Sequence, residues 1–320
     1  MKKDEKIGGN AEPEEGSEKS LREKKLKRAI LACGILAAAM AGICVWQLAR
    51  FYGREKEAET KMEQLRQNLD GTDSAEETNK KISDSVDSER GQIFSENPYE
   101  KLFAQNEDMA AWLVVDGTVI DYPVMQTMED EAYYLKRDFD GNEDEAGCLI
   151  LDTDSDLYAG GTTNLIIHGH NMKTGTMFGS LDEYQDEDYY SEHKYMELYT
   201  ETGKRRYEVM AAFYSQVYYT TDQVFKYYNF FQAQNEEEFR DFYENVKEMS
   251  LYDTGVTAEL GDCFLTLSTC TYHVEDGRFV VVAKEIGRTE LHGDEFSPVV
   301  FSGFLVYNEN QRNRQNPIRK

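Results

Sequence analysis

The sequence predicts a mainly β domain that follows one apolar helix of membrane-spanning length. After Asn97, short apolar runs of strand length alternate with turns rich in Gly, Asp and Asn, a pattern typical of β-rich domains. Nearer the N-terminus, an uncharged stretch extends from Ala29 to Ala49. The chain has 320 residues, so it is long enough to bury a sizeable core.

The stretch from Ala29 to Ala49 has the length of a membrane anchor. About 20 apolar residues cross a bilayer core of about 30 Å as a helix. A cleaved signal peptide is the alternative, and residues 39–41 (AMA) offer a weak cleavage point. The apolar run continues past that point to Trp46 and Leu48, so we expect an uncleaved anchor.

Basic residues flank this stretch unevenly. Lys24, Lys25, Lys27 and Arg28 stand directly before it, whereas the segment after it is rich in acidic residues. This bias predicts a cytoplasmic N-terminus and an extracellular remainder. The expected organisation is a cytoplasmic segment (1–28), an anchor (29–49), a charged stalk (50–96), a catalytic domain (97–287) and a C-terminal extension of unknown role (288–320).

Composition excludes several classes of protein. The 61 acidic and 35 basic residues give a formal charge of -26, which argues against binding to nucleic acid. Five cysteines lie at positions 33, 44, 148, 263 and 270, the first two within the apolar stretch. The other three are an odd number without a C-x-x-C pair, so they predict neither a zinc knuckle nor a disulfide scaffold.

The polar segment from Phe51 to about Glu96 is predicted to be a stalk. Ala58, Met62, Leu65 and Leu69 recur at heptad spacing and indicate a short helix. The pattern is too brief for a coiled coil, which needs three or four heptads. A solvated spacer is therefore the interpretation we favour.

Six apolar runs have the composition of strands, and they lie at residues 117–126, 148–152, 163–170, 205–216, 263–270 and 278–286. One helix is expected from Glu236 to Ser250. Its apolar residues form a single stripe, which we interpret as core packing and not as a binding site. A second helix is expected within residues 98–113.

The last two predicted strands bring Cys270 and Arg278 together. A seven-residue connection, Thr271 to Gly277, separates them, so pairing as a hairpin would place Arg278 beside Cys270. A guanidinium near a thiol favours the thiolate and could also donate to an oxyanion. The alternative is that Cys270 is a buried small residue and Arg278 a solvated charge at a strand edge.

A thiol nucleophile also needs a general acid and base, for which the chain offers five histidines. His193 and His292 lie in polar segments, and His273 lies in the connecting loop. His168 and His170 end a predicted strand and precede a Gly-punctuated loop, where catalytic groups tend to lie. Two histidines at this spacing could share a metal, but no further ligand accompanies them at metal spacing, so no metal is expected.

Three segments in this order resemble a sortase, specifically one of class B. They are WLVVDGTVIDYPVMQ, NLIIHGHNMKTGTMFGSL and TLSTCTYHVEDGRFVVVAKEI. The resemblance extends from about Asn97 to Gly287 and implies a closed β-barrel of about eight strands with flanking helices. The family consists of membrane-tethered cysteine transpeptidases outside Gram-positive cells, which suits the predicted anchor.

The resemblance implies a role for each matching residue. Cys270 would be the nucleophile, His170 the acid and base, and Arg278 the group that stabilises the substrate carbonyl and the oxyanion. Ser268 and Thr269 would line the peptide groove. The implied partners are secreted proteins with a C-terminal sorting signal and a peptidoglycan precursor amine, and neither cofactor nor metal is implied.

Two features depart from the family pattern. His168 stands where the family often has an aromatic residue, so it could compete with His170. The chain also continues beyond Gly287 with a segment that could form a strand, cover the groove or contact the wall. Three alternative functions stay open: a pilin polymerase that uses a Lys amine, a thiol hydrolase, and an inactive anchored module that binds peptides.

Overall fold

The computed structural model describes residues 15–70, 97–157, 162–271 and 273–290. It divides into two compact units, the first ending at Glu57 and the second starting at Ala58. Most of the predicted C-terminal extension, and the part of the predicted stalk after Asp70, lie outside the described residues. The domain boundaries taken from the sequence stay predictions.

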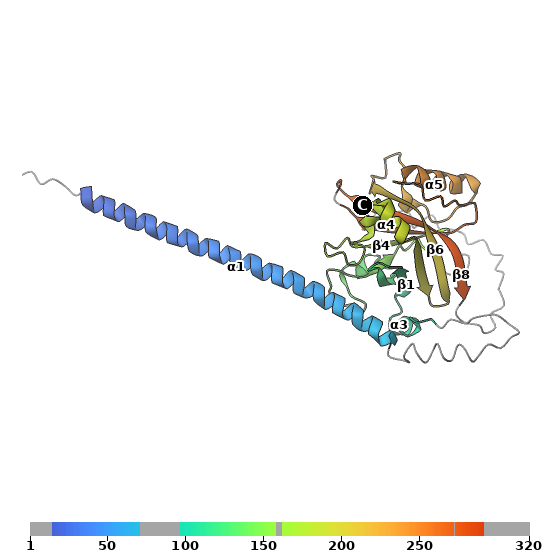
Figure 1. Cartoon of the computed structure of the whole chain (residues 1–320), viewed down its shortest axis with the longest axis horizontal. Helices are drawn as coiled ribbons and strands as arrows, with labels where there is room; N and C mark the ends of the chain where they lie inside the picture. Colours follow the sequence, from blue (N-terminus) through green and yellow to red (C-terminus); the bar gives the residue numbers. More distant parts are fainter. Residues whose placement is uncertain (1–14, 71–96, 158–161, 272, 291–320) are drawn as a thin grey trace, which may run out of the picture. The chain divides into compact units, whose positions relative to one another are not determined.

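The long helix α1 spans Glu15–Asp70 and contains the apolar stretch (Figure 1). Within it, the 29 residues Arg22–Arg50 are long and apolar enough to cross a membrane. In the most apolar 18 residues of this segment, no residue is buried inside the protein. By length and composition, this is the segment in which the sequence predicts an anchor.

The C-terminal part of α1, from Ala58 onward, belongs to the second unit and packs against its core. Met62 is 8% exposed, and Ala58 and Leu65 contact the core of the barrel. Arg66 donates to the carbonyl of Asp121 at 2.6 Å and forms an ion pair with its carboxylate. The stretch from Ala58 to Arg66 is thus a docked helix and not the solvated spacer that we favoured, because Ala58, Met62 and Leu65 lie on one face of the helix and pack against the core.

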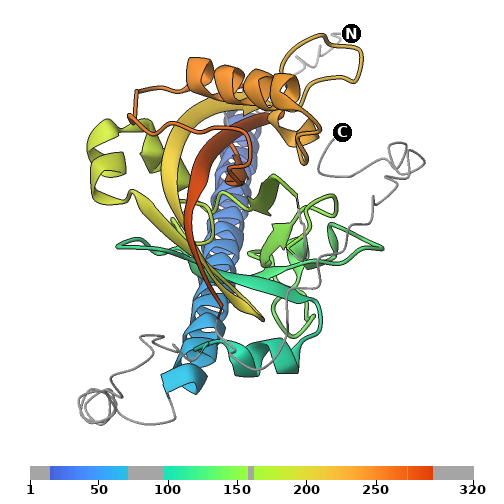
Figure 2. The same cartoon turned by 90° about the vertical axis from the view of Figure 1, so that its right-hand side faces the viewer.

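Eight strands close into a barrel in the order β1-β2-β3-β4-β7-β8-β6-β5 (Figure 2). Their bounds are β1 Met109–Val115, β2 Asp121–Met125, β3 Leu149–Leu151, β4 Asn164–Gly169, β5 Tyr195–Thr200, β6 Gly203–Gln216, β7 Phe264–Cys270 and β8 Gly277–Glu290. The pairs β2–β3 and β4–β7 are parallel, and the other neighbours are antiparallel. The predicted barrel of about eight strands is confirmed.

The helices outside the barrel are short, apart from α1 and α5. The short helices of the described residues are α3 Glu100–Gln105 and α4 Glu187–Glu192, with 3-10 turns η1 Tyr133–Lys136, η2 Leu181–Gln185 and η3 Tyr227–Asn229. Helix α5 spans Glu236–Met249. The predicted helix from Glu236 is confirmed. Its first turn is capped by Asn235, whose side chain accepts from the N–H of Glu238.

The predicted helix within residues 98–113 is mostly wrong. Only α3 is helical, and Met109 and Trp112 belong to strand β1. Trp112 pairs with Pro123 of β2 on one side and with Tyr199 of β5 on the other. These long-range pairings outweigh the local helical pattern. Strand β5 was not predicted, although its alternate residues are buried.

Two hydrophobic cores lie on opposite faces of the wall of the barrel. Leu265, Leu267 and Val281 belong to the larger core, with residues of β1 to β4. Phe264 and Val280, which alternate with them, belong to the second core with Phe239 and Phe242 of α5. The stripe of α5 is therefore core, as predicted. Strands β7 and β8 are held on both faces, which makes this wall a rigid support.

One buried carboxylate ties the loop after η1 to helix α1. Asp138 is 3% exposed and accepts hydrogen bonds from Lys61 and from the backbone N–H groups of Asp140 and Asn142. Burial by itself raises the pKa of Asp138, but the bonds from Lys61 and Asn142 outweigh it and hold that pKa below its usual value.

We expect Asp138→Asn to lower the free energy of unfolding by about 1–3 kcal/mol at pH 7, because a neutral amide cannot accept all of these bonds. A lowered pKa stabilises the protein above the unfolded value of about 4 and stops doing so as the pH falls through the folded value. The variant should therefore lose less stability than wild type between pH 5 and pH 2.

Denaturant unfolding at stepped pH, followed by the fluorescence of buried Trp112, measures both effects. The exposed neighbour Asp140 supplies the matched control, Asp140→Asn. Equal stability and equal acid sensitivity of the two variants would contradict the role given to Asp138.

Candidate active site

The ends of three neighbouring strands bring together His170, Cys270 and Arg278. Strand β4 pairs in parallel with β7 up to Gly169 and Thr269, so the next residues are His170 and Cys270. Strand β8 pairs with β7 and places Arg278 directly opposite Cys270. Adjacent strands lie about 4.8 Å apart, so the three residues meet at one end of the barrel wall. The predicted hairpin between the Cys and Arg strands is confirmed.

Cys270, the last residue of β7, is the residue of this strand that is exposed to solvent. Cys270 is exposed, whereas the other six residues of β7 are buried. His170 and Arg278 are partly exposed. A nucleophile that must meet a large substrate needs such an opening, and a rigid strand behind it keeps its position constant.

His170 is held by a backbone carbonyl. Its Nε2 lies 2.7 Å from the carbonyl oxygen of Leu135 in η1. A carbonyl can only accept, so Nε2 carries the hydrogen and Nδ1 is the nitrogen left to exchange a proton. The backbone carbonyl of His170 also accepts from the N–H of Phe178 at 3.0 Å. Hydrogen bonds therefore hold both the ring and the main chain of His170 in place.

Two side chains join the ends of β4 and β7 on either side of His170. The Thr269 hydroxyl donates to the carbonyl of Gly169 at 2.8 Å. The Asn171 amide donates to the carbonyl of Cys270 at 2.9 Å. These bonds fix the main chain of Cys270 against the segment that contains His170.

Arg278 is steadied by its own loop. Its Nη1 donates to the carbonyls of Asp276 and Gly277 at 3.3 and 3.0 Å. Asp276 has φ 53°, in the left-handed region, which turns the chain into β8. The guanidinium is therefore placed at the mouth of the hairpin and keeps donors for a further acceptor.

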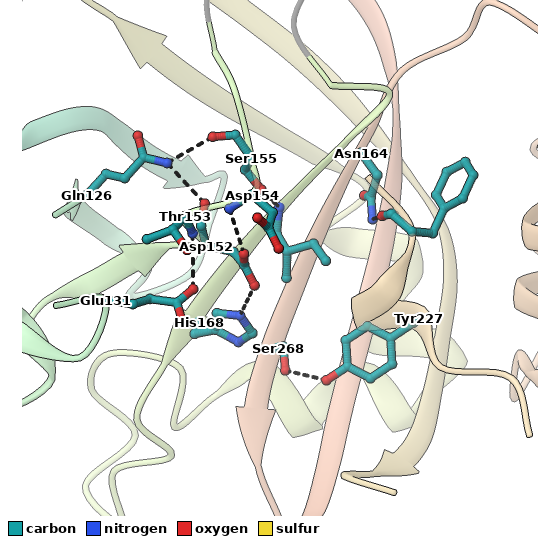
Figure 3. A network of polar contacts seen from close by, with 12 residues as sticks. Gln126, Glu131, Asp152, Thr153, Asp154, Ser155, Asn164, His168, Tyr227 and Ser268 are labelled. Atoms are coloured by element: carbon teal, nitrogen blue, oxygen red, sulfur yellow. Dashed lines mark hydrogen bonds and ion pairs between the residues drawn. The ribbon is translucent and has the colours of Figure 1, made fainter. Parts of the chain in front are cut away.

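The hydroxyls predicted to line the groove are engaged within the protein. Ser268 and Thr269 are each 1% exposed. Ser268 Oγ lies 2.7 Å from the hydroxyl of Tyr227 in η3 (Figure 3). Burial raises the pKa of Tyr227 to about 12, so its phenol stays protonated. Groove lining by Ser268 and Thr269 stays a prediction, and in this structure both hydroxyls hold neighbouring segments in place.

His168 belongs to a buried polar cluster and not to the exposed end of β4. Its Nε2 lies 3.3 Å from a carboxylate oxygen of Asp152, the residue that follows β3 (Figure 3). The carboxylate of Asp152 also accepts from the N–H of Asp154, and Glu131 accepts from the N–H of Thr153. His168 thus shares a strand face with His170 but lies one layer beneath it.

Glu131, Asp152 and His168 each offer a ligand atom within 4.8 Å of the others. A metal could be held by such a set. However, Nε2 of His168 already contacts Asp152, and backbone N–H groups donate to both carboxylates. These contacts account for the cluster, so we assign it a structural role. That the protein uses no metal stays a prediction.

Of the other histidines, His193 and His273 contact other parts of the protein, and His292 lies outside the described residues. Nδ1 of His193 lies 2.9 Å from the carbonyl of Asp116 on the surface. His273 lies in the loop between β7 and β8, and its ring packs against Tyr214 of β6. His292 lies outside the described residues. The geometry therefore favours His170, whose backbone directly follows the last β4–β7 pair.

Comparisons with known proteins show which proteins the chain resembles in sequence and in fold. Residues 113–286 match the Sortase domain family. The chain is 35% identical over 184 residues to sortase B of Listeria monocytogenes, which covers 56% of this chain and 70% of that protein.

Two solved structures of sortase B are similar in fold to this chain. The complex of the Staphylococcus aureus sortase B with its substrate matches with a TM-score of 0.58 and 26% identity, over 72% of this chain and 97% of that one. A sortase B in complex with triglycine matches with the same TM-score and identity, over 72% of this chain and 98% of that one.

We expect the two neighbouring histidines to respond differently to substitution by Ala. His168→Ala should lower the free energy of unfolding by about 1–3 kcal/mol, because it removes a buried partner of Asp152, and should keep most of the activity. His170→Ala should cost less stability, about 0.5–1 kcal/mol for one half-exposed hydrogen bond, and should lower turnover by about 10²–10⁴-fold, the usual effect of removing a general acid. Denaturant unfolding and peptide turnover on both variants decide the matter. The reverse pattern would transfer the acid role to His168.

Proposed function

Because this chain belongs to the sortase family and is a class B cysteine transpeptidase, we propose that Cys270, His170 and Arg278 are its catalytic residues. The observation that supports this most directly is the register that sets Cys270 opposite Arg278 and beside the end of β4. Each residue has the chemistry that acyl transfer requires at that place.

In the proposed reaction, the Cys270 thiolate attacks the carbonyl carbon of a residue in a C-terminal sorting signal, which is typically Thr in the family. Arg278 donates to the oxyanion that forms. As the C–N bond breaks, His170 in its imidazolium form gives its proton to the departing amine. The product is a thioacyl enzyme, with the acyl group joined to the sulfur of Cys270.

An acceptor amine then attacks the thioester. His170, now neutral, takes a proton from the amine, the C–S bond breaks, and Cys270 leaves as a thiolate. The new amide joins the secreted protein to its acceptor. We propose a peptidoglycan precursor amine for this role, supported by the sortase B structure that holds triglycine, since triglycine presents an amine of this kind.

The proposed location is the cell membrane, with a single N-terminal span. Its support is the segment Arg22–Arg50 together with the basic residues at its N-terminal side. The positive-inside bias puts the N-terminus in the cytoplasm and the catalytic domain, which we place at residues 97–287, outside the cell. That is the compartment in which secreted proteins and wall precursors meet.

We expect the full chain in detergent to form a thioacyl adduct on Cys270 when it is incubated with a library of sorting-signal peptides, and to form an amide product when triglycine is added. Intact-protein and peptide mass spectrometry detect both species. Cys270→Ala should form neither. Arg278→Ala should lower kcat by about 10²–10³-fold, the usual effect of losing an oxyanion donor.

Arg288→Ala is the matched control, because Arg288 lies on the same strand and pairs with Glu285 away from the site. Its activity should equal that of wild type. Cleavage without dependence on an amine would identify a hydrolase, and use of a Lys side chain in preference to triglycine would identify a pilin polymerase. Absence of any adduct from a folded wild type would indicate a binding module and contradict the proposal.

A further inference from the structure

The Leu135 carbonyl, which accepts a hydrogen bond from His170, lies close to Gly147. Gly147 lies in the segment before β3, and its φ is 60°, in the left-handed region. A Cβ atom at this position would lie 2.4 Å from the carbonyl oxygen of Leu135 and 2.6 Å from its carbonyl carbon. Real contacts of Cβ are never so short, so a side chain here would have to displace the Leu135 carbonyl.

Backbone hydrogen bonds keep these two segments in register. The carbonyl of Tyr134 accepts from the N–H of Cys148 at 2.9 Å, and the carbonyl of Lys136 accepts from the N–H of Asp144 at 3.0 Å. The carbonyl of Leu135, between them in sequence, accepts instead from Nε2 of His170. Two neighbouring carbonyls thus bind the 144–148 segment, and the one between them binds the histidine.

No side-chain rotation could relieve the contact at Gly147. The nearest atoms to a Cβ there are all backbone: the oxygen and carbon of Leu135 and the oxygen of Tyr134 at 2.7 Å. Both residues belong to η1, whose hydrogen bonds to the 144–148 segment oppose a shift. The least costly response is a rotation of the Leu135 peptide, which would turn its carbonyl away from His170.

We propose that Gly147 is a positioning residue for the general acid: by lacking a side chain, it lets the Leu135 carbonyl accept from Nε2 of His170 and so reserves Nδ1 for proton transfer. This inference rests on the proposed function, in which His170 is the acid and base. Gly147 touches neither the substrate nor the reacting atoms in this scheme. It acts through the orientation and tautomer of the imidazole ring.

The first test uses the unaltered protein. The full chain is labelled with ¹⁵N-histidine, placed in detergent at alkaline pH, and the ring signals of His170 are assigned by their loss in His170→Ala. We expect the neutral ring of His170 to carry its hydrogen on Nε2. A neutral ring protonated on Nδ1 would overturn the proposal without the need for any variant at Gly147.

The second test compares Gly147→Ala with Gly255→Ala. Gly255 has φ 72°, so both substitutions carry similar backbone strain, but nothing lies within 4 Å of a Cβ at Gly255. Gly147→Ala should mix the two tautomers of His170 and lower kcat by at least about tenfold, a part of the usual contribution of a general acid, with KM close to wild type. Gly255→Ala should keep the wild-type tautomer and kcat.

The two tests distinguish a failure of the proposed function from a failure of the positioning role of Gly147. A wild type that holds the Nε2–H tautomer but forms no thioacyl adduct would contradict the proposed function while supporting the placement of the ring. A wild type that forms the adduct, together with a folded Gly147→Ala whose tautomer and kcat equal those of Gly255→Ala, would overturn the role of Gly147 alone. The tautomer of the unaltered protein decides the case if Gly147→Ala does not fold.

Discussion

The parallel pairing of β4 with β7 sets the position of the groups in the candidate site. Six residue pairs, from Asn164 and Phe264 to Gly169 and Thr269, fix the register of the two strands. A slip of one residue would move every side chain to the opposite face of the barrel wall. Because both faces of β7 are buried, such a slip would disrupt the packing of two cores at once. The register therefore places His170 and Cys270 side by side at the strand ends.

Polar contacts beneath the site reinforce this register. His168 contacts the carboxylate of Asp152, which follows β3, and Ser268 forms a hydrogen bond with Tyr227 in η3. Both lie two residues before a proposed catalytic residue and on the same strand face as that residue. Buried polar groups of this kind hold their elements in one arrangement, since each would be left unsatisfied if the neighbouring segment shifted. The exposed reactive groups therefore stand on a layer that has little freedom to move.

Much of the wall formed by β4, β7 and β8 could be predicted from the sequence. Apolar runs of strand length identified β4, β7 and β8, and the short connection between the last two predicted their hairpin. Helix α5 was recognised because its apolar stripe is strong and local. These elements share short-range patterns that depend little on the rest of the chain.

The remaining features depend on contacts between distant parts of the chain. Strand β1 was predicted as part of a helix, because only its pairing with β2 and β5 makes it a strand. The bond from His170 to Leu135 spans 35 residues, and the cluster of Glu131, Asp152 and His168 joins two loops to β4. Tyr227 carried one weak signal, an aromatic pair in a loop. No local sequence pattern could predict that the hydroxyl of Tyr227 forms a hydrogen bond with Ser268.

The adjacency of His170 and Cys270 can be measured directly by disulfide formation. Cα atoms about 5–6 Å apart can be bridged by a disulfide, and residues on neighbouring strands meet that condition. The full-length His170→Cys variant is oxidised mildly and mapped by mass spectrometry without reduction. We expect a disulfide between positions 170 and 270, with Cys148 and Cys263 left free. A free Cys270, or one that pairs with Cys148 or Cys263, would contradict the register on which the site depends.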